Sequence, residues 1–424
     1  MILILFTTSY PYKIALEHNF LDQEVKYLSG NFNRVIIVPE LSNATRYYVN
    51  ANVEIQNEYS ITLSQARQSI ARKIRAMPKI IFSDLFYREI TVYPKIIIQQ
   101  TSIRRFFLYM YIAEQTRKWI CKFIEKERLD PNQCIFYTYW FDAPTLGIGL
   151  VKKNYPEICI VSRAHGYDLY AERHSPAYIP CRHQSLDDLD GLFPDSDAGT
   201  RYISYHYPEY AHLCKTSRLG VVDPGFITSP SKDGIFRIVS CSLLVPVKRV
   251  ELLVKGIIYA ARLRPELRIE WRHFGTGQLK PIIESFAQDN LPDNVNAFFP
   301  GYPLLENLLS FYKNNPIDVF MNVSESEGTP VSVMEAISCG IPIIATAVGG
   351  NPEIVSEQNG ILLSPSPTPE EIAIALFNLW DNTDLALERR KQSRKFWQDK
   401  YNADQNFQSF VDLLKSIRLK KQAT

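Results

Sequence analysis

Long apolar runs are missing from this 424-residue sequence. No stretch reaches the roughly 18 uninterrupted apolar residues that a membrane-spanning helix needs, so we expect a protein that is not integral to a membrane. The chain opens with an apolar run at 2–6 that no basic segment precedes. So short a run favours a first buried strand over a signal peptide.

Paired cysteines are missing as well, because the seven cysteines are scattered, odd in number and form no CxxC motif. This pattern argues against a disulfide framework or a zinc site, and it predicts small buried thiols in a reducing cytoplasm. No DxD-type motif stands out, so we predict no metal and no tightly bound cofactor. No GxGxxG follows the opening strand, where TTSYPY stands instead. A plain NAD-binding protein is therefore the least favoured interpretation.

Positive charge is concentrated in one part of the chain. Residues 61–128 carry fourteen Lys or Arg and five Asp or Glu, whereas the formal net charge of the whole chain is only +2. The segment also holds apolar and aromatic residues, as in SIRRFFLYMYIAEQTRKWICKFIEK. Two interpretations stay open: ordinary surface helices whose charges face water, or a basic aromatic face that docks on anionic lipid. No recognised nucleic-acid module accompanies the segment, so we expect no nucleic-acid partner.

Strand-like apolar runs alternate with helical periodicity along the whole chain, as is typical of parallel α/β domains. The expected strands are 2–6, 34–39, 134–140, 158–164 and 191–196 in the first half, and 236–242, 268–275, 318–324 and 342–347 in the second. The expected helices include 16–28, 104–124, 250–263 and 330–338, and two more over 384–418 with a break near Tyr401.

The length suits two domains, and a cluster of Pro, Gly and Ser at 224–234 predicts the linker between them. We therefore expect domains at 1–224 and 225–400, with a last helix at 401–424 packing back on the first domain. Ligands of open α/β sheets bind at the carboxyl ends of the strands, so the two domains should face each other across a cleft.

The most informative stretch runs from 324 to 355 and reads SESEGTPVSVMEAISCGIPIIATAVGGNPEIV. Glu327 lies just before an expected helix and Glu335 lies about one turn inside it, so both carboxylates can face one pocket. The start of that helix, near Val331, offers unpaired N–H groups and a partial positive charge that suit a phosphate. Gly349-Gly350 permits a tight turn or a close approach to a ligand.

Each of these residues also has an ordinary structural explanation, as a cap, a helix end or a turn. The combination EGxPxxxxEAxxxGxPxIA followed by GGxxEI nevertheless resembles the EX7E region of the family-4 retaining glycosyltransferases. That resemblance implies a GT-B fold, in which two Rossmann-like domains face each other across a cleft. It also implies the transfer of a sugar from a nucleotide-sugar donor with retention of configuration.

Other segments resemble the same family, so that the likeness covers roughly residues 160–360. VPVKRVELLVKGI contains Lys248, which by resemblance would contact the donor diphosphate. HFGTGQL supplies Gly275, from a glycine-rich turn, and FFPGY supplies Gly301, beside the backbone that would meet the nucleobase. In the first half, RAHGYDLY resembles the loop whose histidine, here His165, would lie close to the donor sugar.

Two departures from the family pattern stand out. The usual arginine of its "GRL" segment corresponds here to Leu243, and Arg249 is the expected replacement. The glycine-rich loop that often follows the first strand is absent, and TTSYPYKIALEHNF stands there instead. The acceptor side must therefore be built differently.

The resemblance also implies a role for each candidate residue. Lys248 would neutralise the charge of the leaving group, which is the stabilisation that this reaction most needs. Glu335 would accept hydrogen bonds from the ribose, and Glu327 from the donor sugar. The donor diphosphate would lie on the loop and helix start formed by Gly328, Thr329, Pro330 and Val331. Arg163 and Asp168 are weaker candidates beside His165.

The sequence looks most like bacterial transferases that build exopolysaccharide, capsule or O-antigen repeat units. The expected donor is a UDP-sugar, with a GDP-sugar as second choice, and the expected acceptor is a lipid-linked saccharide. We expect a cytoplasmic protein, peripheral on the inner face of the membrane and docked on anionic lipid through residues 61–128. Two alternatives stay open, a nucleotide-sugar epimerase of GT-B type and a non-catalytic nucleotide-sugar-binding partner of an assembly complex.

Overall fold

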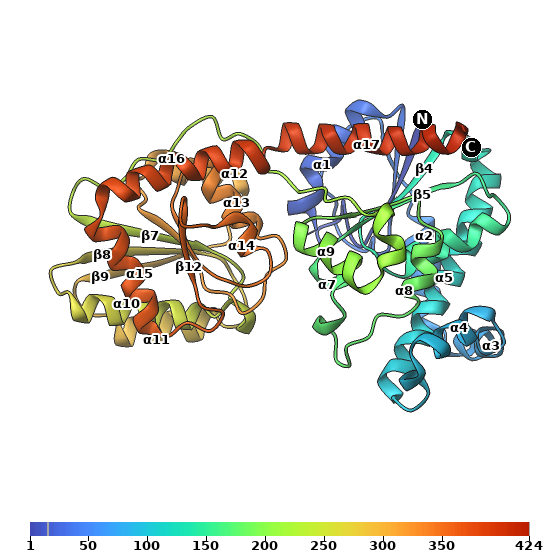
Figure 1. Ribbon diagram of the computed structural model, residues 1–424, viewed down its shortest axis with the longest axis horizontal. Coiled ribbons are helices and arrows are strands. Elements are labelled where there is room, and N and C mark those ends of the chain that lie inside the picture. Colours follow the sequence, from blue (N-terminus) through green and yellow to red (C-terminus); the bar gives the residue numbers. More distant parts are fainter. Residues whose placement is uncertain (15–16, 424) are drawn as a thin grey trace. The chain divides into compact units, whose positions relative to one another are not determined.

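The computed structural model describes residues 1–14 and 17–423, apart from the side chain of residue 19. The chain forms two compact units, the first comprising Met1–Leu219 with Gln405–Thr424 and the second Gly220–Asp404. Each unit has its own six-stranded sheet (Figure 1). Each is therefore described by itself.

The sheet of the first unit is parallel throughout, in the order β3-β2-β1-β4-β5-β6. Its strands are β1 (Ile2–Thr7), β2 (Arg34–Pro39), β3 (Val53–Ile55), β4 (Cys134–Thr138), β5 (Cys159–Ala164) and β6 (Gly191–Pro194). The five strands expected from apolar runs are confirmed. Nearly all of their residues are buried, which is why apolar runs mark them. The three-residue edge strand β3 carries too short an apolar pattern to be recognised.

Helices cover this sheet and extend beyond it. They are α1 (His18–Asn31), α2 (Glu58–Gln68), α3 (Ile70–Ile81), α4 (Asp84–Val92), α5 (Gln100–Glu127), α6 (Ala143–Gly149), α7 (Gly166–Leu169), α8 (Arg182–Asp187) and α9 (Asp197–His206). The expected helix over 104–124 is confirmed within α5, and α1 contains most of the helix expected over 16–28, whose residue 16 lies outside the described residues. Figure 1 shows α3 and α4 standing away from the sheet of this unit.

The second unit repeats the same arrangement, with a parallel sheet in the order β12-β11-β10-β7-β8-β9. Its strands are β7 (Ile235–Cys241), β8 (Arg268–Phe274), β9 (Val295–Gly301), β10 (Val319–Asn322), β11 (Ile343–Thr346) and β12 (Gly360–Leu363). Its helices are α10 (Val250–Leu263), α11 (Lys280–Asn290), α12 (Leu305–Asn314), α13 (Val331–Ser338), α14 (Asn351–Ile354), α15 (Pro369–Asp381) and α16 (Thr383–Lys400). The expectation of two Rossmann-like domains is confirmed.

Both sheets reverse their strand order at one point, between β1 and β4 in the first unit and between β7 and β10 in the second. Loops that leave two neighbouring strands in opposite directions open a crevice at the carboxyl ends of those strands, and ligands of such sheets bind there. The fold therefore marks two places to search, the loops after β1, β4 and β5 and the loops after β7 and β10.

The last helix, α17 (Ala403–Ala423), returns to the first unit, as expected. Phe410, Val411 and Leu414 are buried in the apolar core beneath the first sheet. The Phe410 ring lies edge-on to Tyr137 and Phe193, with ring centroids 5.5 and 5.4 Å apart. Such edge-to-face pairs add to the stability gained from burial alone.

We predict that Phe410→Ala lowers the free energy of unfolding of the first unit by about 3–5 kcal/mol, because it leaves a cavity under the sheet. Urea denaturation followed by circular dichroism measures this loss. Leu419→Ala, on the same helix but 55% exposed, is the matched control and should change the stability by less than about 0.5 kcal/mol. Equal losses in the two variants would contradict the packing of α17 described above.

Candidate functional site

A buried ion pair lies at the carboxyl edge of the second sheet. Lys248, from the loop after β7, places Nζ 2.7 and 2.8 Å from the two carboxylate oxygens of Glu327, from the loop after β10. Asn322 and Ser324 donate further hydrogen bonds to Oε1 of Glu327, at 2.9 and 2.6 Å. The carboxylate is 7% exposed, and a buried charge of this kind needs such partners. Two predicted site residues are thus bound to each other.

The backbone around Glu327 is fixed by two glycines. A Cβ atom on Gly349, whose φ is +52°, would lie 1.9 Å from the carbonyl oxygen of Glu327. A Cβ on Gly350 would lie 2.4 Å from the carbonyl oxygen of Gly328, which also accepts a hydrogen bond from the Gly350 N–H at 2.9 Å. The GG pair thus allows the protein's own loop to approach closely, and this accounts for both glycines without a ligand.

The loop continues through Thr329 and Pro330 into α13, which begins at Val331. Within the part of the chain that the structure describes, no side chain caps this helix at its N-cap residue, Pro330. The first N–H groups of α13 are therefore available to an anion, which the positive end of the helix dipole would attract.

Glu335 lies one turn further along α13. Burial raises the pKa of its carboxyl group to about 8. Although the residue as a whole is only partly buried, no hydrogen bond to its carboxyl group occurs within the described part of the chain. At neutral pH the group is mainly protonated, so it can both donate and accept a hydrogen bond. Those are the properties expected of a partner for ligand hydroxyls.

Arg249 directs its guanidinium group at the protein backbone. Its Nε donates to the carbonyl of Val323 at 2.8 Å, and its Nη2 donates to those of Ser324 and Pro365 at 2.7 and 2.9 Å. These bonds brace the end of β10, directly behind the Glu327 loop. The predicted contact of Arg249 with a ligand stays a prediction, since much of its donor capacity is already used.

Gly275 directly follows β8, and Gly301 is the last residue of the neighbouring strand β9. A Cβ on Gly275 would lie 1.9 Å from the Ser242 carbonyl oxygen, so the loop after β7 can pack there only against a glycine. The Gly275 N–H donates to the carbonyl of Gly301 at 2.9 Å. A Cβ on Gly301 would meet nothing within 4 Å, so space lies open beside it.

His165 lies in the first unit, after β5, where it caps α7. Its ring is held between Tyr139 and Trp140, with both centroid distances 4.6 Å. Asp168 accepts the His165 backbone N–H at 2.7 Å, and its other carboxylate oxygen lies 3.9 Å from Nδ1. Burial lowers the pKa of His165, but the nearby Asp168 carboxylate outweighs this and leaves the pKa above its ordinary value. Arg163 instead binds Glu24 in the core, at 3.0 Å.

One residue near this histidine escaped sequence reasoning. The Glu17 carboxylate accepts the backbone N–H groups of Thr8, Ser9 and Tyr10, at 3.0, 2.5 and 2.7 Å. It also accepts the Trp140 indole N–H at 2.7 Å, and so positions one wall of the His165 site. The N–H groups after β1, which in other folds cradle phosphate, are here occupied by a side chain of the protein. A lone glutamate in the sequence gives no sign of this.

In the parts of the chain that the structure describes, no three His, Cys, Asp or Glu side chains are placed to hold a metal ion. The structure thus groups the predicted residues in two sets. Lys248, Glu327, Glu335 and the loop to Val331 lie together in the second unit. His165 and Asp168 lie together in the first.

Comparison with known families covers the region of the set in the second unit. Residues 236–382 match the family model described as "Glycosyl transferases group 1". The GtfA subunit of the UDP-N-acetylglucosamine–peptide N-acetylglucosaminyltransferase of Streptococcus agalactiae is 24% identical over 257 residues. That match covers 55% of this chain and 49% of the relative, so the chain spans about half the length of this curated protein.

Solved structures match over nearly the full length. The lipopolysaccharide outer core galactosyltransferase WaaB gives a TM-score of 0.66 at 12% identity, covering 98% of this chain and 99% of its own. Anabaena Alr3699/HepE, crystallised with UDP-glucose, gives a TM-score of 0.63 at 14% identity. The match covers 98% of this chain and 100% of that structure's chain. The chain therefore has the GT-B fold, and its second unit relates it to the group 1 glycosyltransferases.

We predict that Glu335 makes the stability of the second unit depend on pH. The folded state binds a proton up to about pH 8, whereas in the unfolded chain the group ionises near pH 4.5. The stability that this proton contributes is complete below pH 4.5 and is lost as the pH rises through 8. Glu335→Gln removes the titration, so its free energy of unfolding relative to wild type should rise between pH 5 and 8, by at most about 1.4 kcal/mol per pH unit.

Urea unfolding of both proteins at several pH values measures this difference. A constant gap between wild type and Glu335→Gln over the whole range would contradict a raised pKa. Glu353→Gln, a substitution of another glutamate in the same unit, controls for the replacement of a glutamate by glutamine in general.

Proposed function

We propose that this chain, related through its second unit to the group 1 glycosyltransferases, transfers a hexose from a nucleotide-sugar donor to a saccharide acceptor. The observation that carries the proposal is the second-unit site. There a lysine, a buried carboxylate, an uncapped helix start and a protonatable glutamate meet at the point where strand order reverses. Cationic, anion-binding and hydroxyl-binding groups in one crevice suit a sugar diphosphate.

In this proposal the donor diphosphate lies over the start of α13. An ammonium group has three protons and Lys248 gives two to Glu327, so one is left for a phosphate oxygen. As the sugar–phosphate bond breaks, negative charge grows on the leaving diphosphate and strengthens that contact. Glu335 binds the ribose hydroxyls and Glu327 binds a hydroxyl of the sugar, while His165 contacts the sugar from the first unit.

The base of the donor and the stereochemistry of the transfer are proposed from the chain's resemblance to other glycosyltransferases. A UDP-sugar is favoured over a GDP-sugar, because the GtfA relative is named for UDP-N-acetylglucosamine and HepE was crystallised with UDP-glucose. Retention of configuration is part of the proposal because the EX7E resemblance implies it. An epimerase or a non-catalytic partner would also bind the nucleotide, but neither would pass the sugar to an acceptor.

The acceptor in this proposal is a lipid-linked saccharide at an anionic membrane surface, reached through α3 and α4. Ile70, Ile74 and Phe82 are 71%, 60% and 77% exposed, which is unusual for side chains of this size. Arg72 and Arg75 lie on the same helix as the two isoleucines, on a groove of about 380 Å³. We call residues 70–98 the apolar basic face. No helix that the structure describes has the length and apolar character needed to cross a membrane.

We predict that one nucleotide stabilises the protein selectively. UDP at 100 times its Kd should raise the stability by about 2.7 kcal/mol, and GDP, ADP and CMP should do less. Lys248→Ala and Glu335→Ala should lose this response in a thermal-shift titration. Lys255→Ala, whose side chain is half exposed on α10, is the matched control and should keep it. A UDP response that both site variants retain would contradict this donor site.

We also predict that the protein binds vesicles containing phosphatidylglycerol and not vesicles of phosphatidylcholine alone. Each cation near an anionic surface contributes about 1 kcal/mol to the free energy of membrane binding. The double substitution Arg72→Ser with Arg75→Ser removes two cations and should therefore weaken vesicle binding about thirtyfold. A flotation assay at low and high salt measures this, with Lys391→Ser, an exposed cation of the second unit, as control. Binding that ignores phosphatidylglycerol, or that survives the double substitution, would contradict the membrane part of the proposal.

A further inference from the structure

A chain of buried hydrogen bonds joins β7 and β8 at the base of the loop that carries Lys248. The side chains involved belong to Trp271, Ser240 and His273, which are 0%, 3% and 0% exposed. The Trp271 indole N–H donates to the Ser240 hydroxyl oxygen at 2.9 Å, and that oxygen lies 2.9 Å from Nδ1 of His273. On the other side of the ring, Nε2 of His273 lies 3.2 Å from the carbonyl oxygen of Ser242. None of the donor contacts proposed above uses these side chains.

The partners of His273 fix which of its ring nitrogens carries the proton. A carbonyl oxygen can only accept, so Nε2 must be the N–H group that donates to Ser242. An indole N–H can only donate, so the Ser240 hydroxyl accepts from Trp271 and gives its own proton to Nδ1. Burial lowers the pKa of His273 to about 4, which keeps the ring neutral. The hydrogen bonds therefore run in one direction, from the indole to the Ser242 carbonyl.

The Ser242 carbonyl stands at the start of the loop after β7. A Cβ atom on Gly275 would lie 1.9 Å from this oxygen and 2.8 Å from Nε2 of His273, so the glycine and the histidine enclose the carbonyl together. The Leu244 N–H donates to the carbonyl of Thr276 at 2.9 Å, which ties the same stretch to the loop after β8 once more. The base of the Lys248 loop is thus held by β8 and the residues that follow it.

The other end of the loop is held by the segment after β10, and β7 lies between β8 and β10 in the sheet. The Glu325 N–H donates to the Val247 carbonyl at 2.8 Å, and Lys248 binds Glu327. Residues 242–248 are therefore fixed from both neighbouring strands. A displacement of about 1 Å in a positioning group can cost about two orders of magnitude in rate, so a cation that must meet a phosphate needs a loop held in this way.

We propose that His273 is a positioning residue of the donor site, which fixes the base of the loop 242–248, and thereby the place of Lys248, by donating from Nε2 to the Ser242 carbonyl. This role rests on the proposed function, since it serves the same donor site. The His273 ring is fully buried, so it acts through the loop and does not touch the donor. Packing alone could be met by an apolar side chain, whereas this role requires a hydrogen-bond donor at the Nε2 position.

Two substitutions of similar shape separate the two ring nitrogens. The amide nitrogen of glutamine can take the place of Nε2, and that of asparagine the place of Nδ1. His273→Gln therefore keeps a donor for Ser242, whereas His273→Asn loses that donor and keeps a partner for Ser240. The Tm should fall in both variants, because each loses one buried hydrogen bond. Arg268→Gln, at the exposed start of the same strand, is the matched control.

Hydrogen exchange of the ligand-free protein measures how firmly the loop is held. The peptide that spans residues 242–248 should exchange faster in His273→Asn than in wild type, and at the wild-type rate in His273→Gln. In isothermal titration calorimetry with UDP, the Kd should rise about fivefold in His273→Asn and stay within about twofold of wild type in His273→Gln, since one hydrogen bond separates the two. Arg268→Gln should match wild type in both measurements.

The two readouts tell failure of this role from failure of the proposed function. Equal exchange or equal UDP affinity in the two His273 variants would overturn the role, because the nitrogen that is kept would then make no difference. If UDP binds none of the proteins while exchange still separates the two variants, His273 holds the loop and the donor proposal fails.

NMR of the wild-type imidazole decides the matter if a variant does not fold. At neutral pH, His273 should carry its proton on Nε2 and none on Nδ1. A proton on Nδ1, or on both nitrogens, would overturn the proposed role, because the ring would then not be the neutral donor to Ser242 that the role requires.

Discussion

The ion pair between Lys248 and Glu327 is the contact on which the second unit's site depends. It joins the loops after β7 and β10, the two strands between which the sheet reverses its order. A buried carboxylate is stable only with partners, so the pair fixes where both loops lie. Arg249 and the Gly349-Gly350 turn hold the backbone behind it. The uncapped start of α13 and the Glu335 carboxyl thereby lie beside the same loops.

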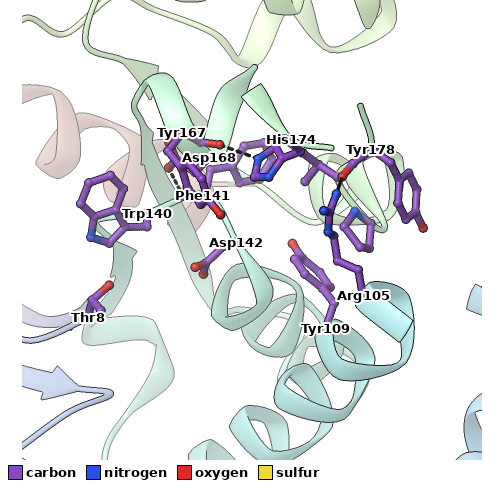
Figure 2. A pocket seen from close by; sticks show the side chains of 12 residues that line it. Thr8, Arg105, Tyr109, Trp140, Phe141, Asp142, Tyr167, Asp168, His174 and Tyr178 are labelled. Carbon is purple, nitrogen blue, oxygen red and sulfur yellow. Dashed lines mark hydrogen bonds between the residues drawn. The ribbon is translucent and has the colours of Figure 1, made fainter. Parts of the chain in front are cut away.

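The first unit uses the same topology with opposite chemistry. Where a phosphate-binding loop could follow β1, the Glu17 carboxylate fills the ring of N–H groups and positions Trp140 against His165. This unit therefore offers aromatic surfaces (Figure 2) instead of an anion site after β1.

The sequence predicted most strands of the two sheets because buried parallel strands are continuous apolar runs. It missed the edge strands β3, β9 and β12, the helices between 58 and 92, and the short helices α6 to α9. It placed Lys248, Glu327 and Glu335 in one unit through motif spacing, since a strand–loop–helix junction is a local structure. It could not reveal the role of Glu17 or the carbonyl contacts of Arg249, because these depend on segments that are distant in sequence. Arg163 looked like a site residue, yet it pairs with Glu24 in the core, and only tertiary packing decides that.

We expect the second unit to hold a nucleotide-sugar donor between Lys248, the start of α13 and Glu335. A crystal structure of the full chain grown with UDP tests it most directly. Phosphate oxygens should lie within hydrogen-bond distance of the Lys248 ammonium and of the first N–H groups of α13, with the ribose hydroxyls on Glu335. Bound UDP that touches none of these three groups would contradict it.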